Sequence, residues 1–194
     1  MNRIDIKIAG FGGQGVIMAG AILGKAASIF DDKFATMIQS FGPEARGSAC
    51  SAQVVIDAEA IAYPYIKRPS VLVAMNQEAF KLFAPQLPEH GTLIYEQDIV
   101  EPKGISLPED RMFGIPATRI AEDVGRTIVL NVVMVGFFAA VTGFLSRQSV
   151  EDAVKDSIPR GTEKMNLDAL GRGFEYGQKL LIERKLEPAF AATA

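Results

Sequence analysis

The residues that most clearly indicate a binding site are a cluster of glycines near the N-terminus. Gly10, Gly12 and Gly15 match the pattern G-x-G-x-x-G, in which glycines let the backbone turn sharply and approach a ligand closely. The alternating apolar run 4–9 precedes them, and the apolar stretch 16–30 follows at once. A helix beginning there would present N–H groups that have no partner within the helix. A strand, a tight turn and a helix in this order predict a binding site for an anion.

This pattern has three interpretations. A dinucleotide-binding turn needs an acidic residue at the end of the second strand, where it binds a ribose hydroxyl. The predicted second strand, 34–38, is followed by Gln-Ser-Phe at 39–41, whereas Asp31 and Asp32 lie before it. The missing acid disfavours an NAD-dependent oxidoreductase. A turn that only packs a helix on a strand, and a turn that binds an anion or a partner, both remain open.

A second candidate region is the irregular segment 39–48, which reads QSFGPEARGS. It follows a strand, so we expect it at the same carboxyl edge of the sheet as the glycine turn, where ligands bind in open α/β folds. Arg46 is flanked by small residues, and its planar guanidinium suits a carboxylate or a phosphate. Glu44 is close enough in sequence to form a simple surface ion pair with Arg46 instead.

Composition excludes several classes of protein. The chain has 194 residues, 48% of them hydrophobic, and a formal net charge of −3, so neither a basic nucleic-acid surface nor a disordered chain is predicted. One cysteine, Cys50, is too few for an iron–sulfur cluster or a Cys-rich zinc site within this chain. The lone His90 lies in a turn-like Pro-Glu-His-Gly sequence and suggests no catalytic triad. No signal peptide is evident at the N-terminus, so we expect a cytoplasmic protein.

Strands and helices are predicted to alternate along most of the chain. This alternation predicts an α/β fold: a Rossmann-like, mostly parallel sheet flanked by helices, with a helical C-terminal part. We expect a single domain over 1–187 and a loose tail over 188–194. The expected strands are 4–9, 34–38, 49–56, 70–75, 92–95 and 111–115, and the expected helices are 15–30, 76–82 and 116–124.

The segment 127–145 carries no charge and approaches the length of a membrane span. Asn131 near its start, and a chain otherwise patterned for water, favour a buried helix. Small residues on one face would let another helix approach closely, and we expect that face to form a subunit interface. These small residues are Gly136, Ala139, Ala140 and Gly143.

Two further helices are expected near the C-terminus. Residues 149–152, Ser-Val-Glu-Asp, resemble a capping box at the start of the first. An amphipathic stripe of apolar residues from Leu167 to Leu181 predicts the second. Both are expected to pack on the sheet without carrying chemistry.

The motifs in combination resemble one family. GFGGQGVIMAG followed by QSFGPEARGSACSAQVVI, then a Tyr-Pro pair at 63–64 and LVAMNQEAF, is similar to the gamma subunit of the 2-oxoacid:ferredoxin oxidoreductases, the pyruvate/ketoisovalerate oxidoreductase gamma family. The resemblance covers essentially the whole chain, and GPEARG with Tyr-Pro is most similar to the 2-oxoglutarate type. Ser48 stands where a second glycine is common.

The resemblance implies one part of an enzyme. In this family, thiamine diphosphate with Mg lies between alpha and beta subunits, and iron–sulfur clusters lie on the beta or a delta subunit. The complete reaction converts a 2-oxoacid and coenzyme A (CoA) to an acyl-CoA and CO2 while reducing ferredoxin, or runs in reverse. The gamma subunit is expected to be inactive alone and to contribute CoA binding. The alternative is a Rossmann-like nucleotide-binding or scaffold subunit of another complex.

The resemblance also implies roles for individual residues. Gly10, Gly12, Gly13 and Gly15 would bring the backbone to the CoA phosphates, with the Gln14 side chain as a further donor. Arg46 would face the thiamine site as the catalytic residue of this chain and bind the carboxylate of the 2-oxoacid or steady CoA. No metal ligand is expected here.

Overall fold

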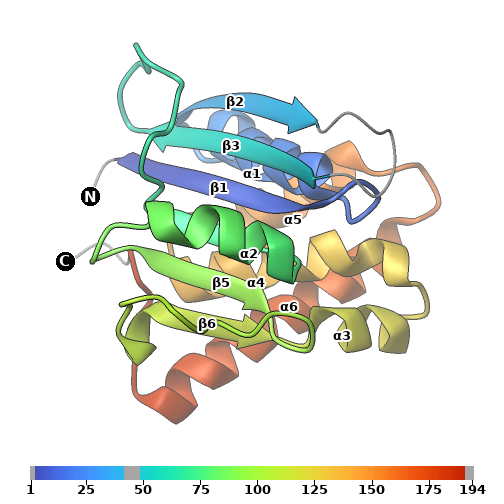
Figure 1. Ribbon diagram of the computed structural model, residues 1–194. Coiled ribbons are helices and arrows are strands. Elements are labelled where there is room, and N and C mark those ends of the chain that lie inside the picture. The colour runs from blue at the N-terminus through green and yellow to red at the C-terminus, as the bar shows by residue number, and fades with distance from the viewer. Residues whose placement is uncertain (1–2, 42–48, 191–194) are drawn as a thin grey trace.

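The computed structural model describes residues 3–41 and 49–190. These residues form one six-stranded sheet with the strand order β2-β3-β1-β4-β5-β6 (Figure 1). β3 runs antiparallel to β1 and to β2, whereas β1, β4, β5 and β6 are parallel, so β3 alone is reversed. The predicted α/β fold with a mostly parallel sheet is confirmed. The strands are β1 (Arg3–Phe11), β2 (Phe34–Phe41), β3 (Ala49–Asp57), β4 (Val71–Ala74), β5 (Thr92–Glu96) and β6 (Met112–Ile115).

The reversal of β3 separates this sheet from a dinucleotide-binding one. In the usual arrangement the strand after the first helix lies directly beside the first strand. Here β3 lies between β1 and β2, with Phe11 opposite Ala49 and Phe41 opposite Cys50. Residues 39–41 continue β2, so our prediction that an irregular segment begins at Gln39 was wrong. They extend the strand because they pair with the first residues of β3.

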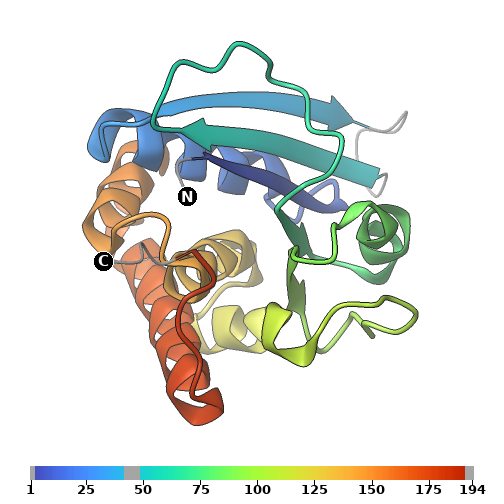
Figure 2. The same cartoon turned by 90° about the vertical axis from the view of Figure 1, so that its left-hand side faces the viewer.

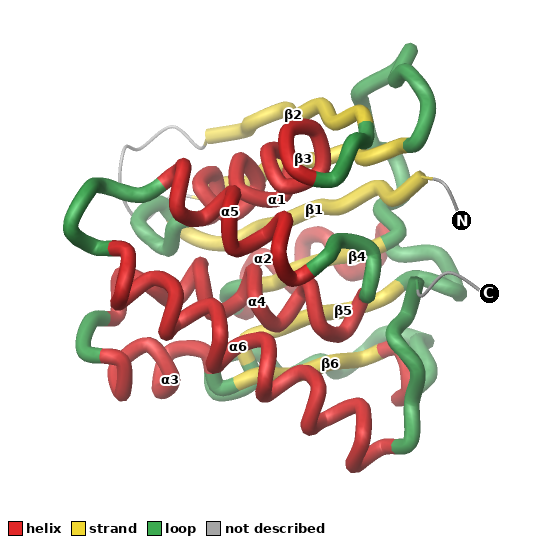
Figure 3. Tube along the Cα trace, turned by 180° about the vertical axis from the view of Figure 1, so that it is seen from behind, coloured by secondary structure: helices red, strands yellow, loops and turns green. Residues whose placement is uncertain are grey.

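Helices cover the two faces of the sheet unequally. α1, α3, α4, α5 and α6 lie on one face, as the view from behind shows (Figure 3). α2 lies on the opposite face, where the loop after β3 also arches over the sheet (Figure 2). The helices are α1 (Val16–Phe30), α2 (Gln77–Phe83), α3 (Ala117–Val124), α4 (Leu130–Thr142), α5 (Arg147–Ser157) and α6 (Glu163–Arg184), with short 3-10 turns at 84–86, 109–111 and 127–129.

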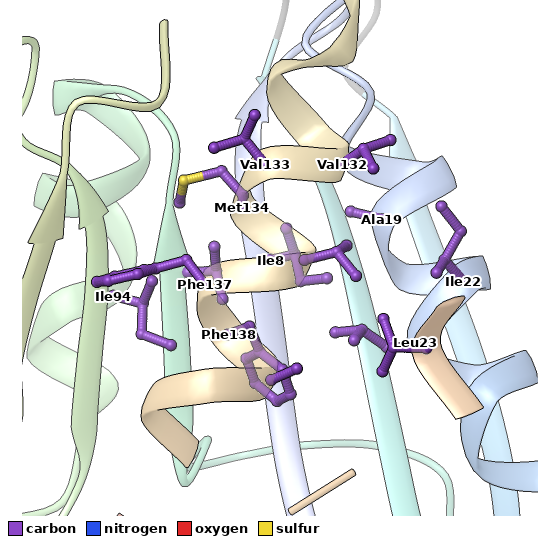
Figure 4. Close-up of a cluster of buried hydrophobic side chains, with 14 of the residues drawn as sticks. Ile8, Ala19, Ile22, Leu23, Ile94, Val132, Val133, Met134, Phe137 and Phe138 are labelled. Carbon is purple, nitrogen blue, oxygen red and sulfur yellow. The ribbon is translucent and has the colours of Figure 1, made fainter. Parts of the chain in front are cut away.

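α4 is the central helix of the core, and all of its residues are buried. Phe137 and Phe138 of α4 pack among apolar side chains of the sheet and of α1, including Ile8 and Leu23 (Figure 4). Among the described helices, none is long and apolar enough to cross a membrane. The apolar composition of this segment reflects burial on every side within the chain.

The small residues of α4 contact α6 of the same chain, and our prediction that this face forms a subunit interface was wrong. A β-carbon placed on Gly136 would lie 2.1 Å from the carbonyl oxygen of Leu170, and one on Gly173 would lie 2.1 Å from that of Val133. A β-carbon on Gly177 would lie 2.7 Å from the β-carbon of Ala140. The two helices therefore cross with their backbones nearly in contact, because glycines face each other at the crossing.

The start of α5 and the residues after α6 differ in detail from the prediction. The N-cap of α5 is Ser146, whose hydroxyl accepts the backbone N–H of Ser149, so the cap lies one turn before the predicted one. The tail expected to be loose begins with ordered contacts. Ala189 and Phe190 donate backbone hydrogen bonds to the carbonyls of residues 141 and 142 at the end of α4.

Candidate functional site

The glycine turn joins β1 to α1 at the carboxyl edge of the sheet. Gly13 has φ +103° and Gly15 has φ +74°, conformations that favour glycine strongly. A β-carbon on Gly13 would meet nothing within 4 Å, so the backbone there is open to an approaching group. By contrast, a β-carbon on Gly10 would lie 2.6 Å from the side chain of Gln14. Gly10 therefore serves packing inside the turn, and Gly13 is the position that faces open space.

Gln14 holds the turn in shape. Its Oε1 accepts the backbone N–H of Phe11 at 2.7 Å, and its Nε2 donates to the carbonyl of Met75 at 3.0 Å. Asn76, the N-cap of α2, donates to the same Oε1 at 3.2 Å. These bonds tie the turn to the end of β4 and the start of α2. The side-chain donation to CoA expected of Gln14 stays a prediction, and the open backbone of the turn is the stronger candidate for ligand contact.

A cavity of about 540 Å³ lies against the glycine turn. Gly12, Gly13 and Gly15 form part of its wall, together with the first turn of α1. Cys50 lies in the same wall, and burial raises the pKa of its thiol, so the group stays protonated near neutral pH. Most of the remaining wall is apolar. Its apolar side chains include Phe11, Val16, Ile17, Met18, Phe41, Ile128, Val129, Ile158, Pro159 and Met165.

Three helices begin at this cavity. α1, α4 and α6 all start on the side of the sheet where β1 ends (Figure 1), and residues from the beginning of each line the cavity. The first N–H groups of a helix generally lack partners within it and carry partial positive charge. In α4, which continues from the 3-10 turn 127–129, the N–H of Leu130 already donates to the carbonyl of Thr127. Arg126 adds a full positive charge to the wall and forms no ion pair with the described residues. The arrangement favours a ligand that combines anionic and apolar parts.

Two buried asparagines also line the cavity, and our sequence analysis assigned them no role in binding. Asn131 in the first turn of α4 is 3% exposed, and Asn166 of α6 is 7% exposed. Asn131 stood out in the sequence only as a polar residue inside an uncharged run. Its position beneath Gly15 depends on tertiary packing, so residue spacing could not reveal it.

Arg46 lies outside the described residues. The residues on either side of its segment, Phe41 and Ala49, both lie at the carboxyl edge of β1, since Ala49 is paired with Phe11 and Phe41 with Cys50. Phe41 also lines the cavity. The expected location of the segment and the role of Arg46 both stay predictions.

Neither His90 nor any group of possible metal ligands among the described residues forms a second candidate site. His90 is exposed in a turn closed by the hydrogen bond from Gly91 N–H to the carbonyl of Pro88, before β5 and therefore at the opposite edge of the sheet. Within residues 3–41 and 49–190, no three His, Cys, Asp or Glu side chains are grouped so that they could hold a metal ion.

Comparison with known proteins identifies the type of chain in which this geometry occurs. Residues 5–176 match the family model described as pyruvate ferredoxin/flavodoxin oxidoreductase. The chain is 47% identical over 191 residues to the 2-oxoglutarate synthase subunit KorC of Methanothermobacter marburgensis, an alignment that covers 93% of this chain and 98% of the relative.

Two solved structures have similar folds. The gamma subunit of a keto/oxoacid ferredoxin oxidoreductase from Geobacter sulfurreducens PCA is 35% identical, with a TM-score of 0.80 over 91% of this chain and 99% of that subunit. A 2-oxoglutarate:ferredoxin oxidoreductase from Magnetococcus marinus, solved with 2-oxoglutarate, coenzyme A and succinyl-CoA bound, is 20% identical. Its TM-score is 0.78 over 98% of this chain and 32% of that one, a likeness of fold.

Proposed function

Because this chain belongs to the pyruvate ferredoxin/flavodoxin oxidoreductase family and is a gamma subunit of the 2-oxoglutarate type, we propose that it supplies the CoA-binding surface of its complex. The reaction is the conversion of 2-oxoglutarate and CoA to succinyl-CoA and CO2 with reduction of ferredoxin, or the reverse. Partner alpha and beta subunits, with or without a delta subunit, complete the enzyme. We place the complex in the cytoplasm, in keeping with the unpaired Cys50.

The observation that carries this proposal is the open backbone of the glycine turn at the cavity. Gly13 offers its backbone without a side chain, and the first turn of α1 offers N–H donors beside it. A CoA phosphate placed there would accept hydrogen bonds from these donors and benefit from the partial charge of the helix. Arg126, in the same wall, would attract the phosphates electrostatically.

The described residues fit CoA and offer no place for the other cofactors. They include no acidic cluster for a magnesium ion and one cysteine, which is buried. We propose that thiamine diphosphate with Mg and the iron–sulfur clusters are bound by the partner subunits, where thiamine would supply the carbon chemistry when bound. This chain contributes binding and orientation: the turn holds CoA, and Arg46 completes the 2-oxoacid pocket by pairing with a carboxylate.

The second candidate, a non-catalytic nucleotide-binding or scaffold subunit of another complex, has less support. The reversed strand β3 lies where a dinucleotide-binding sheet has its second parallel strand, and β2 ends without an acid. The family match also covers most of the chain.

The proposal is tested by isolating the chain with the proteins that co-purify with it and assaying reduction of methyl viologen. We expect the complex to require both 2-oxoglutarate and CoA, and to contain thiamine diphosphate and iron. The chain purified alone should show no activity. Activity of the isolated chain, or a complex whose 2-oxoglutarate oxidation does not depend on CoA, would contradict the proposed function.

A further inference from the structure

Asn131 is a polar side chain in the wall of the cavity. It is 3% exposed, lines the cavity, and forms no side-chain hydrogen bond with any residue in the described ranges. Asn166, the other buried amide here, donates instead to the carbonyl and hydroxyl of Thr162 at 3.0 and 3.1 Å. Asn131 is therefore available to a ligand.

The other side chains that line the cavity indicate which part of a ligand would bind near Asn131. Met18, Phe41 and Ile128 line the cavity although they are 42%, 67% and 66% exposed. Large apolar side chains at the wall of a cavity favour an apolar occupant, because covering them removes apolar surface from water. A phosphate group would gain nothing from these contacts. The turn and Arg126 suit phosphates, and the apolar wall suits another part of the same ligand.

The chemistry of a carboxamide narrows the choice further. Asn131 has both donors and an acceptor. A phosphate accepts only, so it could use the donors of Asn131 but not its oxygen. A secondary amide has one donor and one acceptor and can satisfy both groups. The pantetheine arm of CoA contains secondary amides separated by short apolar segments, which matches an apolar cavity with the Asn131 amide in its wall.

Resting on the proposed function, we infer that Asn131 is a specificity-determining residue that binds an amide of the pantetheine arm of CoA within this cavity. The phosphates then lie at the glycine turn, close to Arg126. The Asn131 side chain packs directly against the backbone of Gly15. A β-carbon on Gly15 would lie 2.5 Å from the Asn131 Cγ. Glycine at position 15 thus both allows the tight turn and leaves room for the Asn131 amide.

The test measures dissociation constants in the purified complex for two probes, CoA and 3′-phospho-ADP. The second probe keeps the nucleotide and the diphosphate but lacks the pantetheine arm. Asn131→Leu, which keeps the branched shape of the side chain but has no amide, should raise the dissociation constant of CoA roughly tenfold and leave that of 3′-phospho-ADP unchanged. If Asn131→Leu does not assemble, Asn131→Ala removes the same amide with a smaller side chain, and the same result is expected.

Thr142→Val provides a matched control at the other end of α4. Thr142 is fully buried and its hydroxyl donates to the carbonyl of Phe138, away from the cavity. It should leave both constants unchanged. An unchanged affinity for CoA in the Asn131 variants, or an equal loss for both probes, would overturn the inference.

The experiments distinguish failure of the role inferred for Asn131 from failure of the proposed function. If the wild-type complex does not bind CoA, or if Gly13→Val leaves CoA binding unchanged, the proposed function fails and this inference fails with it. If CoA binds and Gly13→Val weakens it while the Asn131 variants do not, only the role of Asn131 is rejected.

Discussion

Gly15 and Asn131, far apart in the sequence, occupy adjoining space at the start of two helices. A β-carbon on Gly15 would lie 2.5 Å from Cγ and 2.7 Å from Cβ of Asn131. Gly15 also has φ +74°, so any other residue there would be strained even without a neighbour. This contact fixes the distance between the glycine turn and α4, and through it the shape of the cavity.

Gly15→Ala should therefore lower the free energy of unfolding by about 1–3 kcal/mol, through backbone strain and overlap with Asn131. Adding Asn131→Ala should recover part of that loss, because it removes the overlap with Cγ but leaves the overlap with Cβ and the backbone strain. Urea denaturation of the two single variants and the double variant measures the coupling. Strictly additive losses would show that the overlap does not contribute.

The crossing of α4 and α6 depends on Gly173. Gly173→Ala should lower the free energy of unfolding by about 1–3 kcal/mol, because its β-carbon would lie 2.1 Å from a carbonyl oxygen of α4 and the helices must separate. Gly171, two residues earlier on the same helix, is the matched control. Its β-carbon would have its nearest neighbour at 3.9 Å, so Gly171→Ala should stabilise by about 0.4–1 kcal/mol. Equal effects of the two substitutions would contradict the crossing.

The fold followed from local patterns except where tertiary contacts decided the outcome. Alternating apolar runs predicted the strands, and the glycine cluster predicted the start of α1 nearly to the residue. The reversal of β3 was missed, although seven residues between Phe41 and Ala49 are too few for the crossover that a parallel pair requires. The burial of α4 was predicted, but its face of small residues was wrongly assigned to a subunit interface, because composition does not identify which element covers that face.

Of the candidate site, only the glycine turn could be predicted from the sequence. The positive φ of Gly13 and Gly15 and the open turn follow from residues adjacent in sequence. Arg126, Asn131 and Asn166 reach the cavity from other helices, and no spacing rule relates their positions to the turn. The role of Gln14 in bracing the turn was likewise hidden, since its partners Met75 and Asn76 come from the end of β4.

Lys7 on β1 predicts a pH dependence of stability. It is 5% exposed, its Nζ donates to Gln86 Oε1 at 3.0 Å and lies 4.3 Å from the centre of the Phe83 ring. Among the described residues no carboxylate pairs with it. Burial lowers the pKa of Lys7 from its ordinary value of 10.5. Between the folded and unfolded pKa values the unfolded chain binds more protons, so the free energy of unfolding should rise with pH there.

Lys7→Met should stabilise the protein at neutral pH and remove that alkaline rise, since a neutral side chain of similar length has no charge to desolvate. Thermal unfolding followed from pH 7 upwards measures both effects. Lys81→Met, at an exposed position of α2, is the control and should not change the slope. A slope that persists in Lys7→Met would show that another group causes it.

Arg46 is expected to act through its charge and its planar pair of donors. A charge-assisted contact of about 1.5–3 kcal/mol implies that Arg46→Ala lowers the specificity constant for 2-oxoglutarate roughly 10- to 100-fold. Arg46→Lys should recover only part of this, because an ammonium loses the paired geometry. Comparison with 2-oxobutyrate, which lacks the distal carboxylate, identifies the partner. An equal penalty for both acids, with CoA unaffected, would exclude recognition of the distal carboxylate.

Binding of CoA at the glycine turn is tested by the Michaelis constant for CoA in the complex carrying Gly13→Val. The new side chain would enter the open space where we place a CoA phosphate, so KM for CoA should rise on the order of tenfold, or ~1.4 kcal/mol, with little change in KM for 2-oxoglutarate. Gly104→Val controls for backbone strain, because Gly104 also has a positive φ, +82°, and open space around its β-carbon, and it does not line the cavity. If the constant for 2-oxoglutarate rises while that for CoA stays unchanged, or if Gly104→Val has the same effect, the glycine turn does not bind CoA.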